Sequence, residues 1–307
     1  MFPTLAVLLA ALCFSTTGTA QALAGVDASA LSVGASRLLV GGSVLGIVAL
    51  VDARRGSRRE ESTRTSRHAL PTWLVVALGV LGVLAYQPLF FAGTRLNGVA
   101  VGTVLTLGSA PVTTGILDAL LRRRLPSLRW LAATLVAVVG VLLVSGILGA
   151  PRGGLVFTPA GVSTSLGAGA AYALLTVSSK LLLDRSWDSR QAMGSIFGIA
   201  ALLSIPVILA TANGWLVTWE GLALAMWLGI VTTAGAYLLF GWGLQHLAPT
   251  TVATLSLSEP LGAALLGVLV LGERLSPSVL SGIAVIVVGL MLLAGTTRSR
   301  GASDSGS

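Results

Sequence analysis

Residues 98–146 read GVAVGTVLTLGSAPVTTGILDALLRRRLPSLRWLAATLVAVVGVLLVSG, and residues 247–295 repeat their pattern as LAPTTVATLSLSEPLGAALLGVLVLGERLSPSVLSGIAVIVVGLMLLAG. Three pairs of residues keep the same offset of 149 positions: Pro111 and Pro260, Gly140 and Gly289, and Gly146 and Gly295. Equal offsets across apolar segments indicate a duplication. Duplicated halves made of membrane spans are typical of secondary transporters.

The composition restricts the class of protein. Hydrophobic residues make up 54% of the chain and charged residues 10%, and the mean hydropathy is +0.92. A soluble domain has about 25% charged residues, so lipid must be the solvent of most of this chain. The net charge of +8 does not indicate a nucleic-acid partner, because the basic residues lie between apolar runs. One cysteine, Cys13, and two distant histidines, His68 and His246, offer no metal site, and we expect no cofactor.

Membrane spans of about 20 apolar residues can be marked at 4–23, 32–51, 71–92, 98–120, 130–148, 161–183, 191–212, 219–244, 250–271 and 278–296. We therefore expect an all-α integral membrane protein of ten transmembrane helices, as two five-helix repeats at 1–148 and 160–296. A linker at 149–159 joins them, and 297–307 is expected to be a disordered cytoplasmic tail. The N-terminal segment is read as a span rather than a signal peptide, because residues 1–20 carry no charged side chain.

The distribution of Lys and Arg predicts the orientation of the spans. With the N-terminus in the cytoplasm, 15 of the 19 basic residues fall in cytoplasmic segments. Five spans per repeat is an odd number, so the two repeats must be inverted relative to each other. The loop after the repeated proline agrees, since it reads Arg-Arg-Arg-Leu at 122–125, inside, and Gly-Glu-Arg-Leu at 272–275, outside. We expect a multi-pass protein of the cytoplasmic membrane with both termini in the cytoplasm.

The two repeated prolines fall near the middle of their spans. Proline lacks an N–H and presses on the carbonyl four residues earlier, so Pro111 and Pro260 are expected to break their helices. A break at this depth is tolerated against protein or a water-filled cavity, and we expect both to line a cavity, although a packing kink is the alternative. Glu259 is the one carboxylate deep inside a span. It is either a proton carrier that couples transport or a neutral group that holds the broken helix together.

Other polar side chains at membrane depth are candidates for substrate binding. They are Gln21, Arg37, Tyr86, Gln87, Ser109, Tyr237 and Trp242. Aromatic rings with a few amides and hydroxyls suit a small zwitterion or an amphipathic metabolite. Tyr86 and Tyr237 are counterparts in the two repeats, each preceded by Ala, and Arg37 is either an interface charge or the partner of a substrate carboxylate. Ser109 could instead bond its own helix, and Trp242 could be an interface anchor. We expect the third, fourth, eighth and ninth spans to line the site.

Two further features have structural explanations. The pairs Gly42–Gly46 and Gly194–Gly198 have the GxxxG spacing that allows helices to approach closely. Lys180 lies one turn from the cytoplasmic end of its span, so its ammonium group is expected to reach the membrane surface.

The stretch LSLSEPLGAALLGVLVLGERLSPSVLSGIAVIVVGLMLLAG at 255–295 resembles the second EamA repeat of the drug/metabolite transporter superfamily. The stretch AYQPLFFAGTRLNGVAVGTVLTLGSAP at 85–111 is similar to the matching part of the first repeat. The resemblance implies a ten-helix inner-membrane carrier, often an exporter of amino acids or other small metabolites. The first repeat departs from the pattern, since Ala110 precedes Pro111 where Glu259 precedes Pro260.

The sequence therefore predicts a carrier that moves a small metabolite across the bilayer by alternating access, with protons as a candidate coupling ion. Amino acids are the first expected substrate class, and hydrophobic amines or drugs are the alternative. We do not expect an enzyme, because the chain has no HExxH or GxSxG motif and no cluster of catalytic residues. A membrane scaffold or receptor is a third class. The protein is expected to be a monomer or a homodimer.

Overall fold

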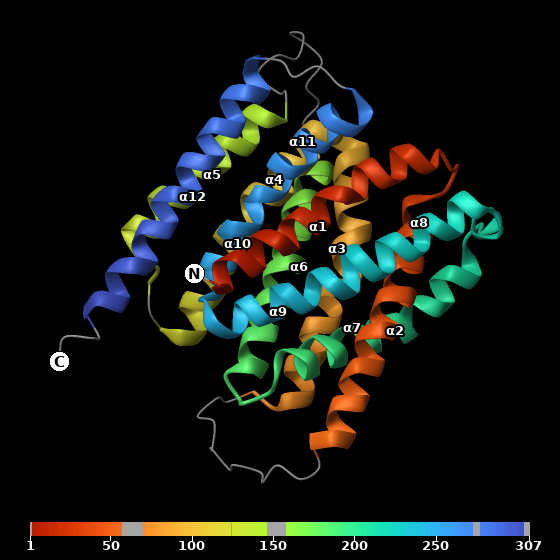
Figure 1. Cartoon of the computed structure of the whole chain (residues 1–307), viewed down its shortest axis with the longest axis horizontal. Coiled ribbons are helices and arrows are strands. Elements are labelled where there is room, and N and C mark those ends of the chain that lie inside the picture. Colours follow the sequence, from red (N-terminus) through yellow and green to blue (C-terminus); the bar gives the residue numbers. More distant parts are fainter. Residues whose placement is uncertain (1, 57–69, 124, 146–157, 273–276, 304–307) are drawn as a thin grey trace.

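The computed structural model describes residues 2–56, 70–123, 125–145, 158–272 and 277–303, and its elements are helical (Figure 1). The first part contains α1 Phe2–Ala24, α2 Ala30–Gly56, α3 Thr72–Asn97, α4 Val99–Arg122 and α5 Leu128–Val144. The second part contains α6 Pro159–Leu183, α7 Ser189–Ala210, η2 Gly214–Val217, α8 Trp219–Gly229, η3 Ile230–Gly235, α9 Ala236–His246, α10 Pro249–Leu255, η4 Ser256–Ser258, α11 Glu259–Leu271 and α12 Pro277–Ser303.

The apolar segments of the sequence become these helices. Among the described residues, eight helical spans are long and apolar enough to cross a membrane, and two shorter apolar helices are Leu128–Val144 and Pro277–Leu293. One of the eight, Trp219–His246, comprises α8, η3 and α9, and another, Pro249–Leu271, comprises α10, η4 and α11. Many large apolar side chains are exposed, among them Trp73, Leu202 and Leu269. This surface suits a lipid environment, and the all-helical membrane fold is confirmed.

The two repeated prolines have different effects on their helices. α4 is one helix from Val99 to Arg122 with Pro111 inside it, so the expected break at this position is wrong. The hydroxyls of Thr113 and Thr114 donate to the carbonyls of Ser109 and Ala110, which precede the proline in the same helix. Before Pro260 the α-helix does end, at Leu255, and a 3₁₀ turn fills Ser256–Ser258 before α11 begins at Glu259.

The ends of the repeats are only partly covered by the described residues. Positions 149–157 of the expected linker, as well as Arg124 and 273–276 of the two compared loops, lie outside them. The segment 297–307 was expected to be disordered, but α12 continues as helix to Ser303. Each added helical residue forms one more backbone hydrogen bond, so a helix that is already nucleated can extend into a polar sequence.

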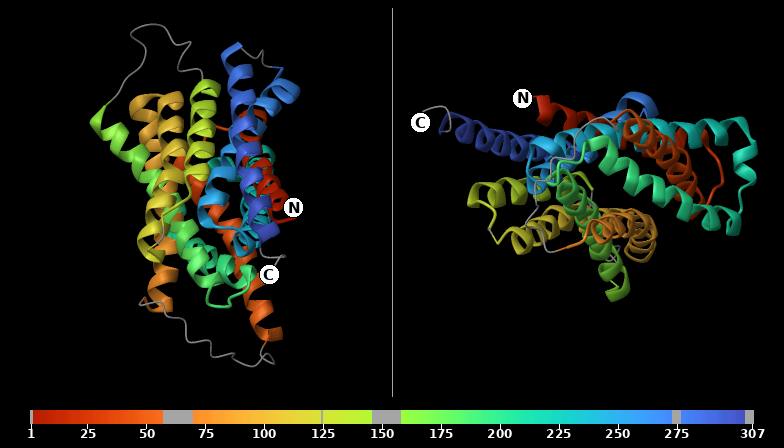
Figure 2. Two further views of the ribbon diagram at one scale, coloured as in Figure 1. Left: turned by 90° about the vertical axis from the view of Figure 1, so that its left-hand side faces the viewer. Right: turned by 90° about the horizontal axis from the view of Figure 1, so that it is seen from below.

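The first helix of each half packs within the other half. α6 packs against α3 and α4, whereas α1 packs against α8, α9 and α11. Figure 2 shows α3, α4 and α6 as one group beside the group that contains α1 and α9 (right-hand view). Two further pairs join the halves, α2 with α7 and α5 with α12. The bundles of the fold are therefore not the two halves of the sequence.

Glycines set the close approach of these pairs. A Cβ atom on Gly42 would collide with the carbonyl oxygen of Phe197, and one on Gly194 would collide with that of Leu45. The GxxxG pairs of α2 and α7 therefore pack on each other, as the sequence predicts. In the α5–α12 pair, a Cβ on Gly140 would lie 2.7 Å from the nitrogen of Ile286.

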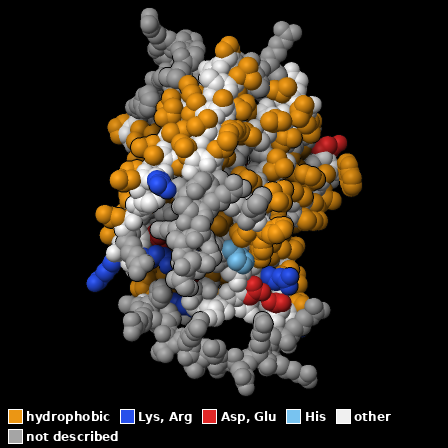
Figure 3. Space-filling model, turned by 60° about the vertical axis from the view of Figure 1, so that its left-hand side comes forward, with side chains coloured by type: hydrophobic (Ala, Val, Ile, Leu, Met, Phe, Trp, Pro, Cys, Tyr) orange, Lys and Arg blue, Asp and Glu red, His pale blue; other side chains and the backbone are white. Residues whose placement is uncertain are grey.

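The charged groups of several helix ends gather at one end of the bundle. Arg122 binds Asp118 and Asp184, Lys180 lies 3.6 Å from Asp184, and Arg190 lies 3.7 Å from Asp52. We call this the basic end, defined by Arg122, Lys180, Arg185 and Arg190. Figure 3 shows charged side chains gathered toward the lower part of one face, with apolar side chains above them. The Lys180 ammonium donates to the carbonyls of Leu244 and Gln245, so it caps the C-terminus of α9.

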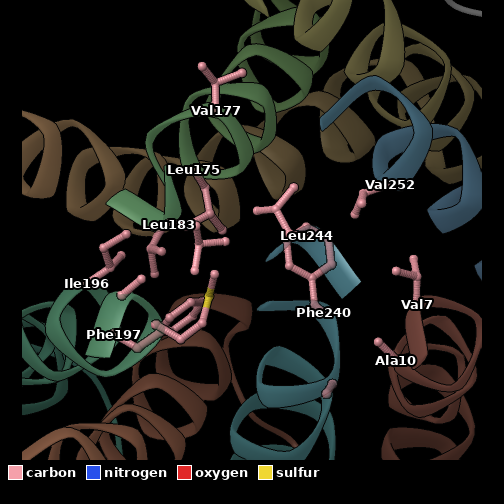
Figure 4. Packing of buried hydrophobic residues seen from close by; sticks show 14 of the residues in the cluster. Val7, Ala10, Leu175, Val177, Leu183, Ile196, Phe197, Phe240, Leu244 and Val252 are labelled. Atoms are coloured by element: carbon pink, nitrogen blue, oxygen red, sulfur yellow. The ribbon is translucent and has the colours of Figure 1, made fainter. Parts of the chain in front are cut away.

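The largest buried core lies in the half of the bundle next to the basic end. Figure 4 shows Phe240 and Leu244 of α9 between Leu175 and Phe197 on one side and Val7 on the other. Toward the opposite end a separate, smaller cluster joins Val33, Trp215 and Leu228 with neighbouring residues of α1, α2 and α8. In the described part of the chain, α3 and α6 contribute no residue to that smaller cluster. The largest apolar cluster therefore lies next to the basic end.

Candidate functional site

A small cavity lies between α2, α3, α6, α7, η3 and α9. Its volume is about 40 Å³, and it is lined by Arg37, Leu38, Gly82, Val83, Tyr86, Gln87, Tyr172, Leu175, Phe197, Thr233 and Tyr237. We call it the central pocket. A volume of this size holds ordered water but not an amino acid. The helices around it must separate before a metabolite can enter.

Arg37 supplies the positive charge of the central pocket. Its Nε donates to the Thr233 hydroxyl at 3.2 Å, and its Nη2 donates to the Thr232 carbonyl at 3.4 Å. No carboxylate forms an ion pair with Arg37 among the described residues. A guanidinium has five N–H donors, so Arg37 keeps donors free. A cation at membrane depth without a protein anion is suited to an anionic group of a ligand.

A π-helical turn positions the partners of Arg37. At η3 the backbone takes the wider π form between α8 and α9, and the hydroxyls of Thr232 and Thr233 both donate to the Leu228 carbonyl. This turn leaves the Thr232 carbonyl available to Arg37. A Cβ on Gly41 would collide with Thr233, so only glycine in α2 allows this approach. Single π turns inside α-helices occur frequently at functional sites, and the sequence analysis missed this one.

Aromatic rings form the wall of the pocket. Tyr237 lies 4.2 Å from Phe197 and 5.1 Å from Phe14 between ring centroids. Tyr86 stacks on Phe90 at 6.0 Å with nearly parallel rings. The repeat counterparts Tyr86 and Tyr237 thus face one cavity. Ring faces and edges stabilise cations and apolar side chains of a ligand.

Gln87 and Tyr172 complete the polar lining. Gln87 packs on Gly34 of α2, and its amide makes no hydrogen bond to any described residue, so it can bind a ligand. Tyr172 was not singled out from the sequence, although a signal exists. The chain has three tyrosines, each preceded by Ala, and all three line this pocket.

Glu259 lies beside the central pocket but not in its lining. It is the first residue of α11 and is half-buried, and its charge interacts with Arg37 and with the three tyrosines. It makes no ion pair among the described residues. The N-terminus of a helix carries partial positive charge, which favours a carboxylate there. Glu259 and Arg37 are therefore two opposite charges at membrane depth that are not paired with each other.

The other sequence candidates lie outside the central pocket. The Gln21 amide donates to the Thr17 carbonyl, and the Ser109 hydroxyl donates to the Thr106 carbonyl, each within its own helix. Trp242 is 39% exposed and packs on His246, one turn along α9. Pro111 is buried within α4, and Pro260 lies in the first turn of α11. α4 contributes no residue to this pocket, and of the third, fourth, eighth and ninth spans expected to line the substrate site, the third and eighth line it.

The described residues include no group of three or more His, Cys, Asp or Glu side chains that could hold a metal ion. The polar groups that meet in the central pocket are one cation, one amide and several hydroxyls. Such a set can bind and orient a small polar molecule.

Comparison with known proteins gives consistent matches. The model of the EamA-like transporter family matches residues 1–146 and 159–295. The chain is 36% identical over 299 residues to the uncharacterized transporter YwfM of Bacillus subtilis, covering 97% of this chain and 96% of that protein. It is 29% identical to protein PecM of Dickeya dadantii, over 72% of this chain and 73% of that protein.

Two further matches cover a smaller part of the chain or have a lower identity. The threonine/homoserine exporter RhtA of Escherichia coli is 33% identical over 131 residues, which cover 43% of this chain and 44% of that protein. A solved crystal structure superposes with a TM-score of 0.75 at 22% identity, over 97% of this chain and 98% of that one. The structural match shows that the fold occurs in another protein of the same size.

Proposed function

Because this chain belongs to the EamA-like transporter family, we propose that it is a secondary transporter that exports an amino acid or a related small metabolite by alternating access. The central pocket is its substrate site. The protein would work as a monomer or as a homodimer.

The observation that carries this proposal is the position of Arg37 and the partners of its guanidinium. Its guanidinium lies in an aromatic pocket at membrane depth, is held by Thr232 and Thr233, and forms no ion pair with a carboxylate of the described residues. Keeping a charge at this depth costs about 2.5–3.5 kcal/mol on the insertion scale. A substrate carboxylate offsets that cost, because arginine forms two parallel hydrogen bonds with a carboxylate.

The ammonium group of an amino acid also complements the carboxylate of Glu259. The carboxylate of the amino acid would bind Arg37, and its ammonium group would face Glu259 and the tyrosine rings once the pocket widens. The likeness to a protein named threonine/homoserine exporter, although it covers less than half of the chain, supports the same substrate class. Glu259 is also the group that would bind a proton on one side of the membrane and release it on the other. Transport of the substrate would then be coupled to the proton gradient.

The arrangement of the helices supports alternating access. In the two repeats α1 corresponds to α6, α2 to α7, the span of α8 and α9 to α3, and α12 to α5. Corresponding helices pack on each other in the α2–α7 and α5–α12 pairs, and the packing of α6 on α3 corresponds to the packing of α1 on α9. This correspondence is what inverted repeats produce. The largest apolar cluster lies next to the basic end, which we propose to be the closed end. By the positive-inside rule we expect that end, with both termini, to lie in the cytoplasm. In the other state the interrupted span at Pro260 would line the opened cavity.

Counterflow in proteoliposomes tests the proposal. Purified protein is reconstituted with internal unlabelled amino acid, and uptake of labelled L-threonine and of a panel of amino acids is measured. We expect uptake of at least one amino acid, and we expect Arg37→Gln to raise its KM by roughly tenfold or more, the range of a hydrogen bond to a charged group. Arg95→Gln is the matched control, because Arg95 is exposed at the end of α3. Equal KM values for wild type and Arg37→Gln would contradict the assignment of the site.

Hydrophobic amines are the second candidate substrates, and three tyrosine rings beside Glu259 favour them. The same assay separates the two classes. An amine substrate would be transported equally well after Arg37→Gln but lost after Glu259→Gln. A membrane scaffold would give no flux of either class.

A further inference from the structure

Tyr172 connects the central pocket to the interrupted span. It lies near the middle of α6, lines the pocket, and donates from its hydroxyl to the Ser256 hydroxyl at 2.9 Å. Ser256 in turn donates its proton to the Val252 carbonyl at 3.1 Å, so its oxygen is free to accept from Tyr172. Among the described residues, the hydroxyls of Tyr86 and Tyr237 form no such bond. Of the three tyrosines, Tyr172 is therefore the one whose hydroxyl is bonded to another span in the described part of the chain.

The bond reaches the point where the helix changes form. Pro260 has no N–H, so the Ser256 carbonyl loses its α-helical partner. The backbone N–H of Glu259 donates to this carbonyl instead and closes the 3₁₀ turn. One residue, Ser256, therefore bonds Tyr172 through its side chain and Glu259 through its backbone. Two hydrogen bonds therefore connect the hydroxyl of Tyr172 to the backbone of Glu259.

The ring of Tyr172 has little freedom to move alone. It meets Phe240 edge-on at 6.2 Å, and Phe240 is fully buried. Gly82 of α3 packs directly on the α6 backbone at Ala171 and Leu175, on either side of Tyr172. A ligand that displaces the tyrosine must therefore shift α6 or break the bond to Ser256. Either change alters the 3₁₀ turn that carries Glu259.

We propose that Tyr172 is a positioning residue, whose hydrogen bond to Ser256 links occupation of the central pocket to the position of Glu259. This role rests on the proposed function, because it assumes that the pocket binds substrate and that Glu259 carries the proton. The titratable and charged groups near enough to interact electrostatically with Glu259 are Arg37 from α2, Tyr86 from α3, Tyr172 from α6 and Tyr237 from α9. Of these, Tyr172 is bonded to the turn itself.

The test uses Tyr172→Phe, Ser256→Ala and the double variant in the full chain. Tyr172→Phe keeps the ring and removes the hydroxyl, and Ser256→Ala removes the acceptor. Ser204→Ala is the matched control, because its buried hydroxyl bonds only its own helix at Ala201. The first measurement is amide hydrogen exchange of peptides within 252–262 in nanodiscs without substrate. We expect both single variants to exchange faster in this segment, and Ser204→Ala to exchange as wild type does.

The second measurement is L-threonine uptake into proteoliposomes with and without a pH gradient. We expect the gradient-driven Vmax to fall roughly two- to tenfold in each single variant, the range of one neutral hydrogen bond, with KM changed less than about twofold. The double variant should be no slower than the single ones, since both remove the same bond. A raised KM with normal Vmax, or effects that multiply in the double variant, would overturn the proposed link.

The two measurements separate the two proposals. If wild type transports none of the tested amino acids, the proposed substrate class is contradicted, and hydrogen exchange alone decides whether Tyr172 holds the turn. Unchanged exchange of 252–262 in both single variants would overturn the link whatever the flux.

Discussion

The Nη2 of Arg122 lies 2.6 Å from the Oδ2 of Asp184, which ties the end of α4 to the end of α6. The same carboxylate lies 3.6 Å from the ammonium of Lys180, and that ammonium caps α9. Asp184 thus holds together three helix ends from both halves of the sequence. It is the centre of the ionic contacts at the basic end.

Replacing Asp184 by Asn should loosen this end. Partly exposed ion pairs contribute about 0–1 kcal/mol each, so we expect the loss of two pairs to lower the free energy of unfolding by about 1 kcal/mol. Thermal unfolding in detergent measures this change. Asp52→Asn is the control, because Asp52 makes one ion pair, at 3.7 Å, with the exposed Arg190. An equal effect of the two substitutions would contradict the central position of Asp184.

Thr233→Val should weaken the hold on Arg37. The Thr233 hydroxyl accepts from Arg37 and donates to Leu228, and valine keeps the shape but removes both bonds. We expect KM for an amino-acid substrate to rise roughly three- to tenfold, because one hydrogen bond that orients the guanidinium is lost. Thr232→Val is the matched variant, since Arg37 bonds the Thr232 carbonyl rather than its side chain. Thr232→Val should leave KM nearly unchanged, and a larger rise there than in Thr233→Val would refute the role of the hydroxyl.

Gly42→Ala should destabilise the α2–α7 pair. The added methyl group would meet the Phe197 carbonyl and the Ala201 side chain, and overpacking of this kind costs about 1–3 kcal/mol. Thermal unfolding checks it. Gly18→Ala in α1 is the control, because a Cβ there meets no atom within 4 Å. Since alanine favours helix more than glycine does, Gly18→Ala should unfold at the same temperature as wild type or higher.

Glu259→Gln should abolish the response of transport to a pH gradient while the protein still inserts and folds. Glutamine keeps the size of the side chain and removes the titratable proton. Uptake with and without an imposed gradient gives the ratio to compare. Glu220→Gln is the control, as Glu220 is exposed in the first turn of α8. Gradient dependence that survives Glu259→Gln would assign proton coupling to another group.

Gln87→Ala and Gln21→Ala should differ, although the sequence suggests both as ligands. The Gln87 amide lines the central pocket and has no hydrogen-bond partner among the described residues, whereas the Gln21 amide bonds its own helix at Thr17. We expect KM to rise roughly three- to tenfold for Gln87→Ala, the range of one hydrogen bond, and to stay unchanged for Gln21→Ala. Equal Kd values in binding assays and equal KM values in uptake assays for the two variants would contradict this distinction.

The sequence was sufficient to place the membrane helices but not the details inside them. Each span needs enough apolar length to cross the bilayer, and this requirement can be read locally. The different outcomes at Pro111 and Pro260 cannot, because the turn before Pro260 is bonded by Tyr172 from another helix. The π turn at η3 likewise packs on Gly41 and is hydrogen-bonded by Arg37, both from α2. Arg37, Tyr86, Gln87 and Tyr237 could be predicted as pocket residues, because polar groups at membrane depth are rare.

The exchange of first helices between the halves has a consequence for biosynthesis. α1 leaves the ribosome long before α9 and α11, the helices it packs against, have been made. α3 and α4 are likewise synthesised before α6, the helix of the second half on which both pack. The nascent chain must therefore hold unpartnered spans in lipid until translation is well past its midpoint. A fragment that stops after α5 would reach the membrane but would have no partner for its first helix.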